Sequence, residues 1–231
     1  MGRTSLQIAY ACSRKMTKIV TDTIRHLPTE RAVEIPWALA RYNGGRRLLE
    51  VGCSFAYDNP EYINGLRALK VPELHGIDIS SVPAPDFIKR TADIRASGYP
   101  QDFFDTVFCI STIEHVGRDN TRHYQPVAEL ETIGDPDVQA LHEMLRITKP
   151  GGRIIITVPF GRLQDHGWFL NYDAPNIERL FRGVEIDEAV YFRFTPEAWV
   201  ACPAGELSLV GYGDNGAPAA AGLACFSITK S

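Results

Sequence analysis

Short apolar runs alternate along this chain with stretches whose apolar positions recur every three to four residues. Four such runs lie at residues 47–52, 74–79, 105–110 and 152–160. Each is bounded by glycine, proline or charged residues, as buried strands of a parallel sheet are. Before the fourth run, Val138, Leu141 and Leu145 recur at helical spacing and predict one buried helical face. Strands that alternate with helices predict a parallel α/β sheet.

Proline, glycine and capping residues place the remaining elements. We expect two helices within 5–41, with Thr29 as the N-cap of the second and Pro36 as a kink or interruption in it. Asp135-Pro136 predicts an N-cap followed by proline at the first helical position, and KPGG at 149–152 ends that helix. Further expected elements are a helix at 60–69, a weak strand at 87–90, a helix at 175–181, a strand within 184–194 and a last strand at 223–230.

Composition narrows the class of protein. The 231 residues suit one α/β domain with small additions, and 45% hydrophobic with 23% charged residues is ordinary for a soluble protein. The net charge of −4 gives no electrostatic footprint for nucleic acid. The five cysteines include no C-x-x-C pair, and no apolar stretch is long enough for a signal peptide core or a membrane span. We therefore expect a cytoplasmic protein that binds neither nucleic acid nor a membrane, and the pattern does not indicate an oligomeric state.

The run LLEVGCSFAYDN at 48–59 carries the clearest chemical signal. An apolar strand enters a tight turn at Gly52, and a second apolar strand ends 26 residues later on Asp78. Open α/β sheets bind ligands at the carboxyl ends of such strands. Asp78 is therefore placed to accept hydrogen bonds from both hydroxyls of a ribose.

The residues of the turn discriminate between cofactors. A dinucleotide fingerprint requires a second glycine two residues after the first, but Ser54 occupies that position and Ala56 the next small one. Glu50 and Asp58 flank the turn and would repel a pyrophosphate. A sulfonium ligand with an amino-acid tail fits these residues better than NAD does. A nicotinamide-dependent oxidoreductase and a non-catalytic partner protein that binds the cofactor remain as alternatives.

Ordered motifs over residues 46–162 resemble one known family. The series EVGCS, HGIDIS, TADIR, FDTVFCISTIEHVG and LRITKPGGRIIITVPFG resembles class I S-adenosylmethionine-dependent methyltransferases. Within that class, ISTIEHVG, TVPFG and the following HGW resemble enzymes of bacterial sugar, polysaccharide or natural-product modification. The chain departs from the family pattern at Ser54 and Ala56, which replace the second and third glycines of the turn.

This resemblance implies both a fold and a cofactor. The implied fold is a Rossmann-like, doubly wound, mostly parallel seven-stranded sheet whose antiparallel last strand lies beside the fifth. An N-terminal helical cap is expected at 1–45 and a methyltransferase domain at 46–231, with S-adenosylmethionine as the cofactor. The implied cofactor contacts are Glu50 near the ammonium group, Gly52, Cys53 and Ser54 under the methionine portion, Asp78 at the ribose, Ile79 and Ile94 beside the adenine, Asp93 at the adenine amino group, and Ile110, Ser111 and Thr112 at the end of the fourth strand.

Methyl transfer from a sulfonium is an in-line displacement. Holding the acceptor atom close to the methyl carbon is worth up to about 7–11 kcal/mol. A hydroxyl acceptor also needs a base, whereas a neutral amine attacks without one. His115 directly follows the fourth strand, and a side chain with an unperturbed pKa of about 6.5 suits proton removal, a role worth about 10²–10⁴-fold. Glu114 beside it orients the imidazole or binds the acceptor. The alternative is that His115 only lines the pocket.

The polar segment 117–134 is too long for a simple connector. We expect it to cover the acceptor, with His123 and Tyr124 as binding residues, although a solvated surface explains it equally well. His115, Asp119 and His123 recur at a spacing of four, which would suit a metal on a helix. Gly117 disfavours that helix, so no metal is predicted.

A second cluster follows the fifth strand. An aromatic side chain there can stack on a sugar face while polar neighbours supply hydrogen bonds, with core packing as the alternative. The candidates are Arg162, His166, Trp168 and Tyr172, and Trp37 before the first strand is a candidate for capping the pocket. The sequence thus predicts methyl transfer to a hydroxyl or amine of a small molecule, with a sugar or glycosylated metabolite favoured.

Overall fold

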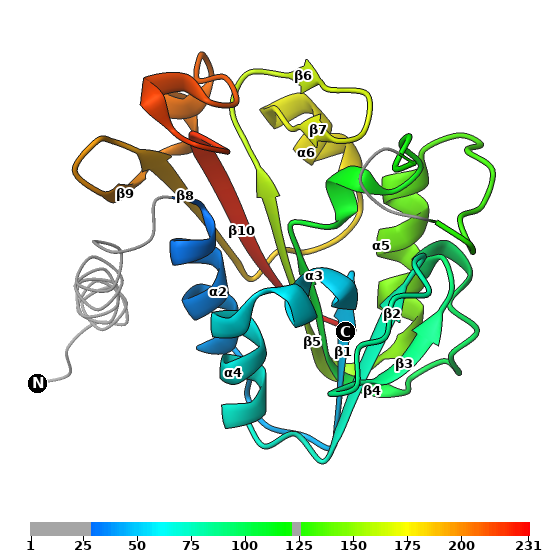
Figure 1. Ribbon diagram of the computed structural model, residues 1–231. Helices are drawn as coiled ribbons and strands as arrows, with labels where there is room; N and C mark the ends of the chain where they lie inside the picture. The colour runs from blue at the N-terminus through cyan, green and yellow to red at the C-terminus, as the bar shows by residue number, and fades with distance from the viewer. Residues whose placement is uncertain (1–28, 122–125) are drawn as a thin grey trace, which may run out of the picture.

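The predicted apolar runs form neighbouring strands of one eight-stranded sheet (Figure 1). The computed structural model describes residues 29–121 and 126–231, so the expected helix before residue 29 lies outside it. In spatial order the strands are β3 (Ile88–Thr91), β2 (Glu73–Asp78), β1 (Arg47–Val51), β4 (Phe104–Ile110), β5 (Thr148–Pro159), β10 (Gly222–Thr229), β8 (Glu188–Phe194) and β9 (Trp199–Cys202).

The sheet reverses its winding direction between β1 and β4. Strands β3, β2, β1, β4 and β5 are parallel neighbours, and β10 pairs antiparallel with both β5 and β8. A mostly parallel sheet with an antiparallel last strand beside the fifth is confirmed. Such a reversal opens a crevice at the carboxyl ends of the two strands, where ligands bind in this architecture.

The sheet has one strand more than predicted. Strand β9 pairs antiparallel with β8 across a tight turn, in which the Thr195 and Ala198 backbones share a hydrogen bond of 2.9 Å. The Thr195 hydroxyl also donates to the Ala198 carbonyl at 2.8 Å. The sequence prediction placed a single strand here because this turn contains neither Asn-Gly nor Asp-Gly, the strongest short hairpin signals.

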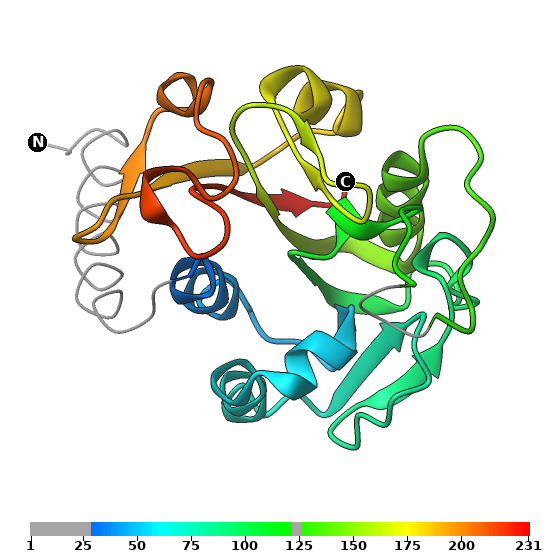
Figure 2. The same cartoon turned by 45° about the horizontal axis from the view of Figure 1, so that its top comes forward.

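Helices cover both faces of the sheet, as the two views in Figures 1 and 2 agree. Helices α2 (Arg31–Leu39) and α4 (Pro60–Ala68) lie on one face, and α5 (Pro136–Ile147) and α6 (Ala174–Leu180) on the other. The remaining elements are α3 (Cys53–Asp58), the two-stranded sheet of β6 (Gln164–Asp165) and β7 (Leu170–Asn171), and the 3₁₀ turns η1 (Ile94–Ala96), η2 (Ile113–His115), η3 (Ala204–Leu207) and η4 (Asp214–Gly216). No helix within the described ranges is long and apolar enough to cross a membrane.

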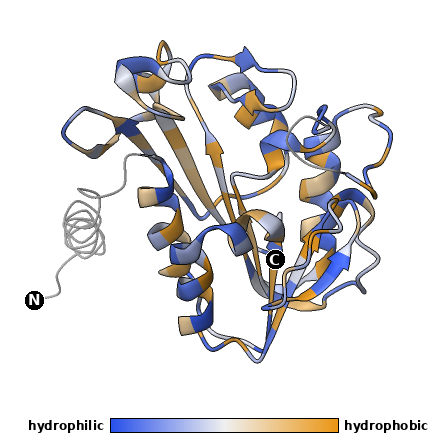
Figure 3. Ribbon diagram, viewed as in Figure 1, coloured by the Kyte–Doolittle hydropathy of each residue, from blue (hydrophilic) through white to orange (hydrophobic). Residues whose placement is uncertain are grey.

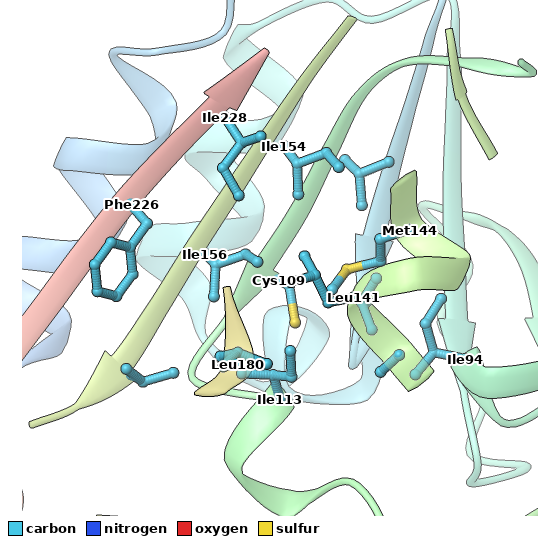
Figure 4. Packing of buried hydrophobic residues seen from close by; sticks show 14 of the residues in the cluster. Ile94, Cys109, Ile113, Leu141, Met144, Ile154, Ile156, Leu180, Phe226 and Ile228 are labelled. Carbon is cyan, nitrogen blue, oxygen red and sulfur yellow. The ribbon is translucent and has the colours of Figure 1, made fainter. Parts of the chain in front are cut away.

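Side chains alternate between two apolar clusters, one on each face of the sheet. On β1, Leu48 packs in the cluster beneath α2 and α4, whereas Leu49 and Val51 pack toward α5. Figure 4 shows the α5 cluster, to which Met144 of α5, Cys109 of β4 and Ile154 of β5 all belong. In Figure 3 apolar colour runs along the central strands, and the helices show both apolar and polar colour. This alternation fixes which side chains can reach the crevice.

The first two helices differ in detail from the predictions. Helix α2 has Glu30, not Thr29, as its N-cap, and it continues through Pro36 without interruption. The short helix α3 was not predicted. It ends at Asn59, whose extended backbone starts α4 and whose side chain accepts a 3.1 Å hydrogen bond from the Tyr62 amide.

Candidate active site

A cavity opens at the carboxyl edge of the sheet, the edge that Figure 2 turns toward the reader. Its empty space, counted out to the open solvent, is about 1040 Å³. The predicted site residues that line it are Gly52, Asp78, Ile79, Asp93, Ile94, Ser111, Thr112, Glu114, His115 and Trp168.

The turn after β1 requires glycine at residue 52. Gly52 has a φ of 82°, and a Cβ built there would lie 2.5 Å from the Oγ1 atom of Thr112. Only glycine adopts this conformation without strain, and here any side chain would also displace Thr112. The chain therefore passes tightly between the ends of β1 and β4 and leaves the cavity open.

Asp78 ends β2 at the wall of the cavity, with its carboxylate held by two backbone amides. Its Oδ2 atom accepts from the Ser54 amide at 2.9 Å and its Oδ1 atom from the Ser80 amide at 2.8 Å. Each oxygen keeps a second lone pair. The carboxylate is thereby oriented to accept two hydroxyl groups, and Ser54 contributes through its backbone while its side chain is buried.

Asp93 is buried, and both oxygens of its carboxylate accept hydrogen bonds. Its oxygens accept from the backbone and guanidinium of Arg95 and from the Leu130 amide, at distances of 2.7 to 3.1 Å. These four bonds fill the roughly four lone-pair sites of a carboxylate. The predicted contact with an adenine amino group therefore requires one of these bonds to be released.

Glu50 does not line the cavity, in contrast to the prediction. Because residues alternate along β1, its side chain shares the face of Leu48 and accepts a 2.6 Å hydrogen bond from the Tyr62 hydroxyl of α4. Burial raises the pKa of Glu50 well above its usual range, although the Tyr62 hydrogen bond opposes this. The side chains of Cys53, Ser54 and Ile110 are buried as well and also do not line the cavity.

His115 is fixed by the loop that follows β5. Its Nδ1 atom lies 2.9 Å from the carbonyl oxygen of Trp168, and the two rings pack with centroids 4.8 Å apart. A carbonyl only accepts hydrogen bonds, so Nδ1 carries the proton in the neutral imidazole and Nε2 carries the lone pair. This tautomer is the one that a base acting through Nε2 requires.

A group of acidic side chains surrounds the start of α2. The carboxylate of Glu34, fully buried, accepts from the hydroxyls of Ser111 and Thr157, each at 2.7 Å, and pairs with Arg31. Glu30 and Arg31 line the cavity together with Glu114, which is buried. Helix α2 thus forms one wall of the site and ties it to the ends of β4 and β5.

Several lining residues were not predicted. They are Glu30, Arg31, Phe55, Glu129, Phe169 and Tyr212. Glu30 and Glu34 recur at a helical spacing of four just before and within a mostly apolar helix, a spacing that puts both carboxyl groups on one helix face. Tyr212 lies in an irregular segment far along the chain, where no local pattern indicates its place.

Most predicted acceptor residues lie elsewhere, which corrects that part of the prediction. Trp37 is buried in the core, with the Arg41 guanidinium 3.6 Å from its ring centroid. The buried hydroxyl of Tyr172 donates to Asp137 at 2.9 Å. Arg162 and His166 are exposed and do not line the cavity. His123 and Tyr124 lie outside the described residues.

Comparison with known proteins agrees with this geometry. A family described as "Methyltransferase domain" matches residues 24–190. None of the curated proteins searched matches the sequence.

Three solved structures share the fold. The [4+2]-cyclase SpnF is 21% identical, with a TM-score of 0.54 over 86% of this chain and 81% of its own. A Burkholderia thailandensis 1,6-didemethyltoxoflavin N1-methyltransferase, solved with 1,6-didemethyltoxoflavin and S-adenosylhomocysteine, is 12% identical (TM-score 0.54, 100% and 92% covered). A Streptomyces coelicolor A3(2) geranyl diphosphate C-methyltransferase is 12% identical (TM-score 0.56, 87% and 81% covered). At these identities the likeness concerns the fold, which hosts different reactions.

Proposed function

The chain belongs to the methyltransferase domain family, and from this premise we propose that it transfers the methyl group of S-adenosylmethionine to a small-molecule hydroxyl or amine. The observation that carries the proposal is the Asp78 carboxylate, oriented by two amides beside the glycine turn at the cavity wall. A ribose diol supplies the two donors that its remaining lone pairs can accept.

The rest of the cavity suits a positively charged cofactor. Among the described lining residues five are acidic, namely Glu30, Asp78, Asp93, Glu114 and Glu129, and one is an arginine, Arg31. Ile79 and Ile94 offer apolar surface beside Asp78 for an adenine ring, and Ser111 and Thr112 close the end of β4. Bound there, S-adenosylmethionine supplies an electrophilic methyl carbon whose leaving group is a neutral thioether.

The protein's own contribution is to position the acceptor and to move a proton. The Nδ1 hydrogen bond to the Trp168 carbonyl fixes the imidazole of His115 with its lone pair on Nε2. That atom takes the proton that a hydroxyl or ammonium acceptor loses, a role worth about 10²–10⁴-fold. Glu114 binds the acceptor from the same wall.

The sugar preference predicted from the sequence finds little support. It depended on polar and aromatic residues after β5, of which Arg162, His166 and Tyr172 do not line the cavity. Trp168 does line it and offers an aromatic face. The acceptor is therefore better sought from the residues that do line the cavity.

The two alternative functions differ in what they predict for ligand binding. We expect calorimetric titration to show binding of S-adenosylmethionine and S-adenosylhomocysteine but not of NAD, since Ser54 replaces the second glycine that a pyrophosphate requires. Binding of NAD alone would overturn the proposal. A cofactor-binding partner protein would bind the first two but yield no labelled methyl product with any acceptor in a screen of amines and alcohols.

A further inference from the structure

Part of the cavity wall makes none of the ribose and adenine contacts assigned above. The residues concerned are Glu30, Arg31, Glu114, Trp168, Phe169 and Tyr212. They come from the start of α2, from η2, from the loop after β5 and from the segment before β10. This acidic and aromatic wall is where an acceptor meets the protein.

Glu114 holds an unsatisfied carboxyl oxygen in this wall. The residue is 3% exposed, and its Oε2 atom has no hydrogen-bond partner among the described residues. Burial raises its pKa well above the usual range, and the nearby Glu34 and Glu30 add repulsion that Arg31 only partly offsets, so a bound cation is what stabilises the carboxylate form. A buried polar atom without a partner is costly, so a ligand that donates a hydrogen bond here removes that cost.

Aromatic rings line the same cavity as this carboxyl group. Trp168 and Phe169 pack edge to face with centroids 4.9 Å apart, and Phe169 lies 4.8 Å from the ring of Tyr212. The face of an aromatic ring attracts a cation, the more strongly when the pair is withdrawn from water. Rings and carboxylates together form a lining that selects positive charge.

The arginine in the wall does not balance these acids. Arg31 pairs with Glu34 behind the wall, its Nε atom lies 3.8 Å from Glu30 Oε1, and its guanidinium lies 4.1 Å over the ring of Phe55. Its single charge is thus shared between Glu34, which does not line the cavity, and Glu30, which does, so the acidic residues outnumber it. A ligand in the cavity therefore meets more acidic than basic side chains.

We propose that the acceptor is an amine carried on an apolar or aromatic body, bound as its ammonium ion by Glu114 and Glu30 against Trp168 and Tyr212, and methylated on nitrogen. The inference rests on the proposed function and names the substrate class of the same site. An uncharged hydroxyl group would not exploit this concentration of negative charge.

The charges in the reaction fit the same wall. The bound ammonium gives one proton to the Nε2 atom of His115, and the nitrogen lone pair then forms a bond to the methyl carbon. The electron pair of the broken carbon–sulfur bond stays on sulfur, so one positive charge passes from sulfur to nitrogen. Carboxylates stabilise charge that develops on the acceptor nitrogen, whereas they would oppose the negative charge that develops on a hydroxyl oxygen losing its proton.

The test uses a matched pair of probes that differ in one group. Phenethylamine and 2-phenylethanol are titrated by calorimetry into the full chain saturated with S-adenosylhomocysteine. We expect the amine to bind at least roughly tenfold more tightly, as one hydrogen bond to a charged group provides. The Glu114→Gln variant should lose this preference, while Glu178→Gln, the same change on an exposed side chain of α6, should keep it.

The outcomes separate the inference from the proposed function. Failure of S-adenosylhomocysteine to bind contradicts the proposed function itself. Normal binding of S-adenosylhomocysteine with no preference for the amine, whether both probes bind or neither does, overturns the inference alone. A preference that survives in Glu114→Gln also overturns the role of that residue. If Glu114→Gln does not fold, the same titration with Glu30→Gln decides.

Discussion

The Nδ1 atom of His115 and the carbonyl oxygen of Trp168 lie 2.9 Å apart, which ties the residue after β4 to the loop after β5. The bond determines the imidazole tautomer and holds the ring against the indole. Two segments that are 53 residues apart in sequence thereby act as one surface of the cavity.

His115→Ala should lower turnover by about 100-fold, because the variant lacks the group that accepts the acceptor's proton. Its affinity for S-adenosylhomocysteine should stay within about twofold, a change of only a few tenths of a kcal/mol. Turnover is measured as transfer of a labelled methyl group to the acceptor found by screening. His142→Ala, on the exposed face of α5, serves as the control, and a fully active His115→Ala would assign the proton to another group.

Asp78→Ala should weaken binding of S-adenosylhomocysteine by about 10- to 100-fold, the loss expected for hydrogen bonds to a charged acceptor. Calorimetry of the two proteins measures the difference. Asp58→Ala removes an exposed carboxylate at the end of α3 and should change the affinity little. Equal affinities for Asp78→Ala and the unaltered protein would exclude Asp78 from the ribose site.

Arg95→Ala should destabilise the fold by about 3–5 kcal/mol, because it strands the buried carboxylate of Asp93 without its ion partner. Arg67→Ala breaks a two-bonded pair of the same kind with Asp86, but the Arg67 side chain is 54% exposed, so the cost should stay below about 1 kcal/mol. Urea unfolding compares the two variants. Similar losses of unfolding free energy in the two variants would contradict the argument that an ion pair costs more to break when it is buried.

The same Arg95 side chain should also hold the segment around Leu130 in place beside the cavity. It donates to the carbonyl groups of Leu130 and Glu131, and Asp93 accepts from the Leu130 amide. We therefore expect the Leu130 amide to exchange with solvent faster in Arg95→Ala than in Arg67→Ala. Unchanged exchange would show that other contacts hold the segment.

Asp137→Asn should make the free energy of unfolding change less as the pH is lowered into the acid range. Burial would raise the Asp137 pKa, but hydrogen bonds from Arg179 and Tyr172 outweigh it and hold the pKa below the ordinary value of 3.8. A lowered folded-state pKa gives stability that is present above pH 3.8 and is lost as the pH falls through the folded value. Unfolding free energies should thus differ by about 1–3 kcal/mol at pH 7 and converge in strong acid. Asp135→Asn, whose side chain is 63% exposed beside the same Arg179, should show little difference at either pH.

The sheet could be predicted from the sequence because each of its parallel strands is indicated by a few residues that are neighbours in the chain. Each parallel strand is an apolar run with a clear boundary, and Asp135-Pro136 marks the start of α5 within one residue. Strand β9 and helix α3 were missed although Pro196 and Gly52 stand at their turns, because elements of four and six residues are too short to show a hydrophobic period. The predictions failed where an element was too short for its apolar residues to repeat.

The site was predicted in part, for a related reason. Asp78 and His115 follow directly from strand ends, which a sequence pattern locates. The misplacement of Glu50 was avoidable, since alternation along β1 puts it on the face of Leu48 rather than toward the crevice. By contrast, Tyr172 finds its partner Asp137 35 residues away, and Glu30 meets Tyr212 in one cavity only through the fold.

The hydrogen bonds from Ser111 and Thr157 to Glu34 have a consequence for anyone who shortens or permutes this gene. The predicted boundary at residue 45 divides a single binding unit, because a chain beginning at Arg46 would lack Glu30 and Arg31 from the cavity wall and leave both hydroxyls without their acceptor. New termini and fusion partners belong instead at exposed connections such as residues 70–72, before β2 at the opposite edge of the sheet. The helix that precedes the first strand is part of the smallest working protein.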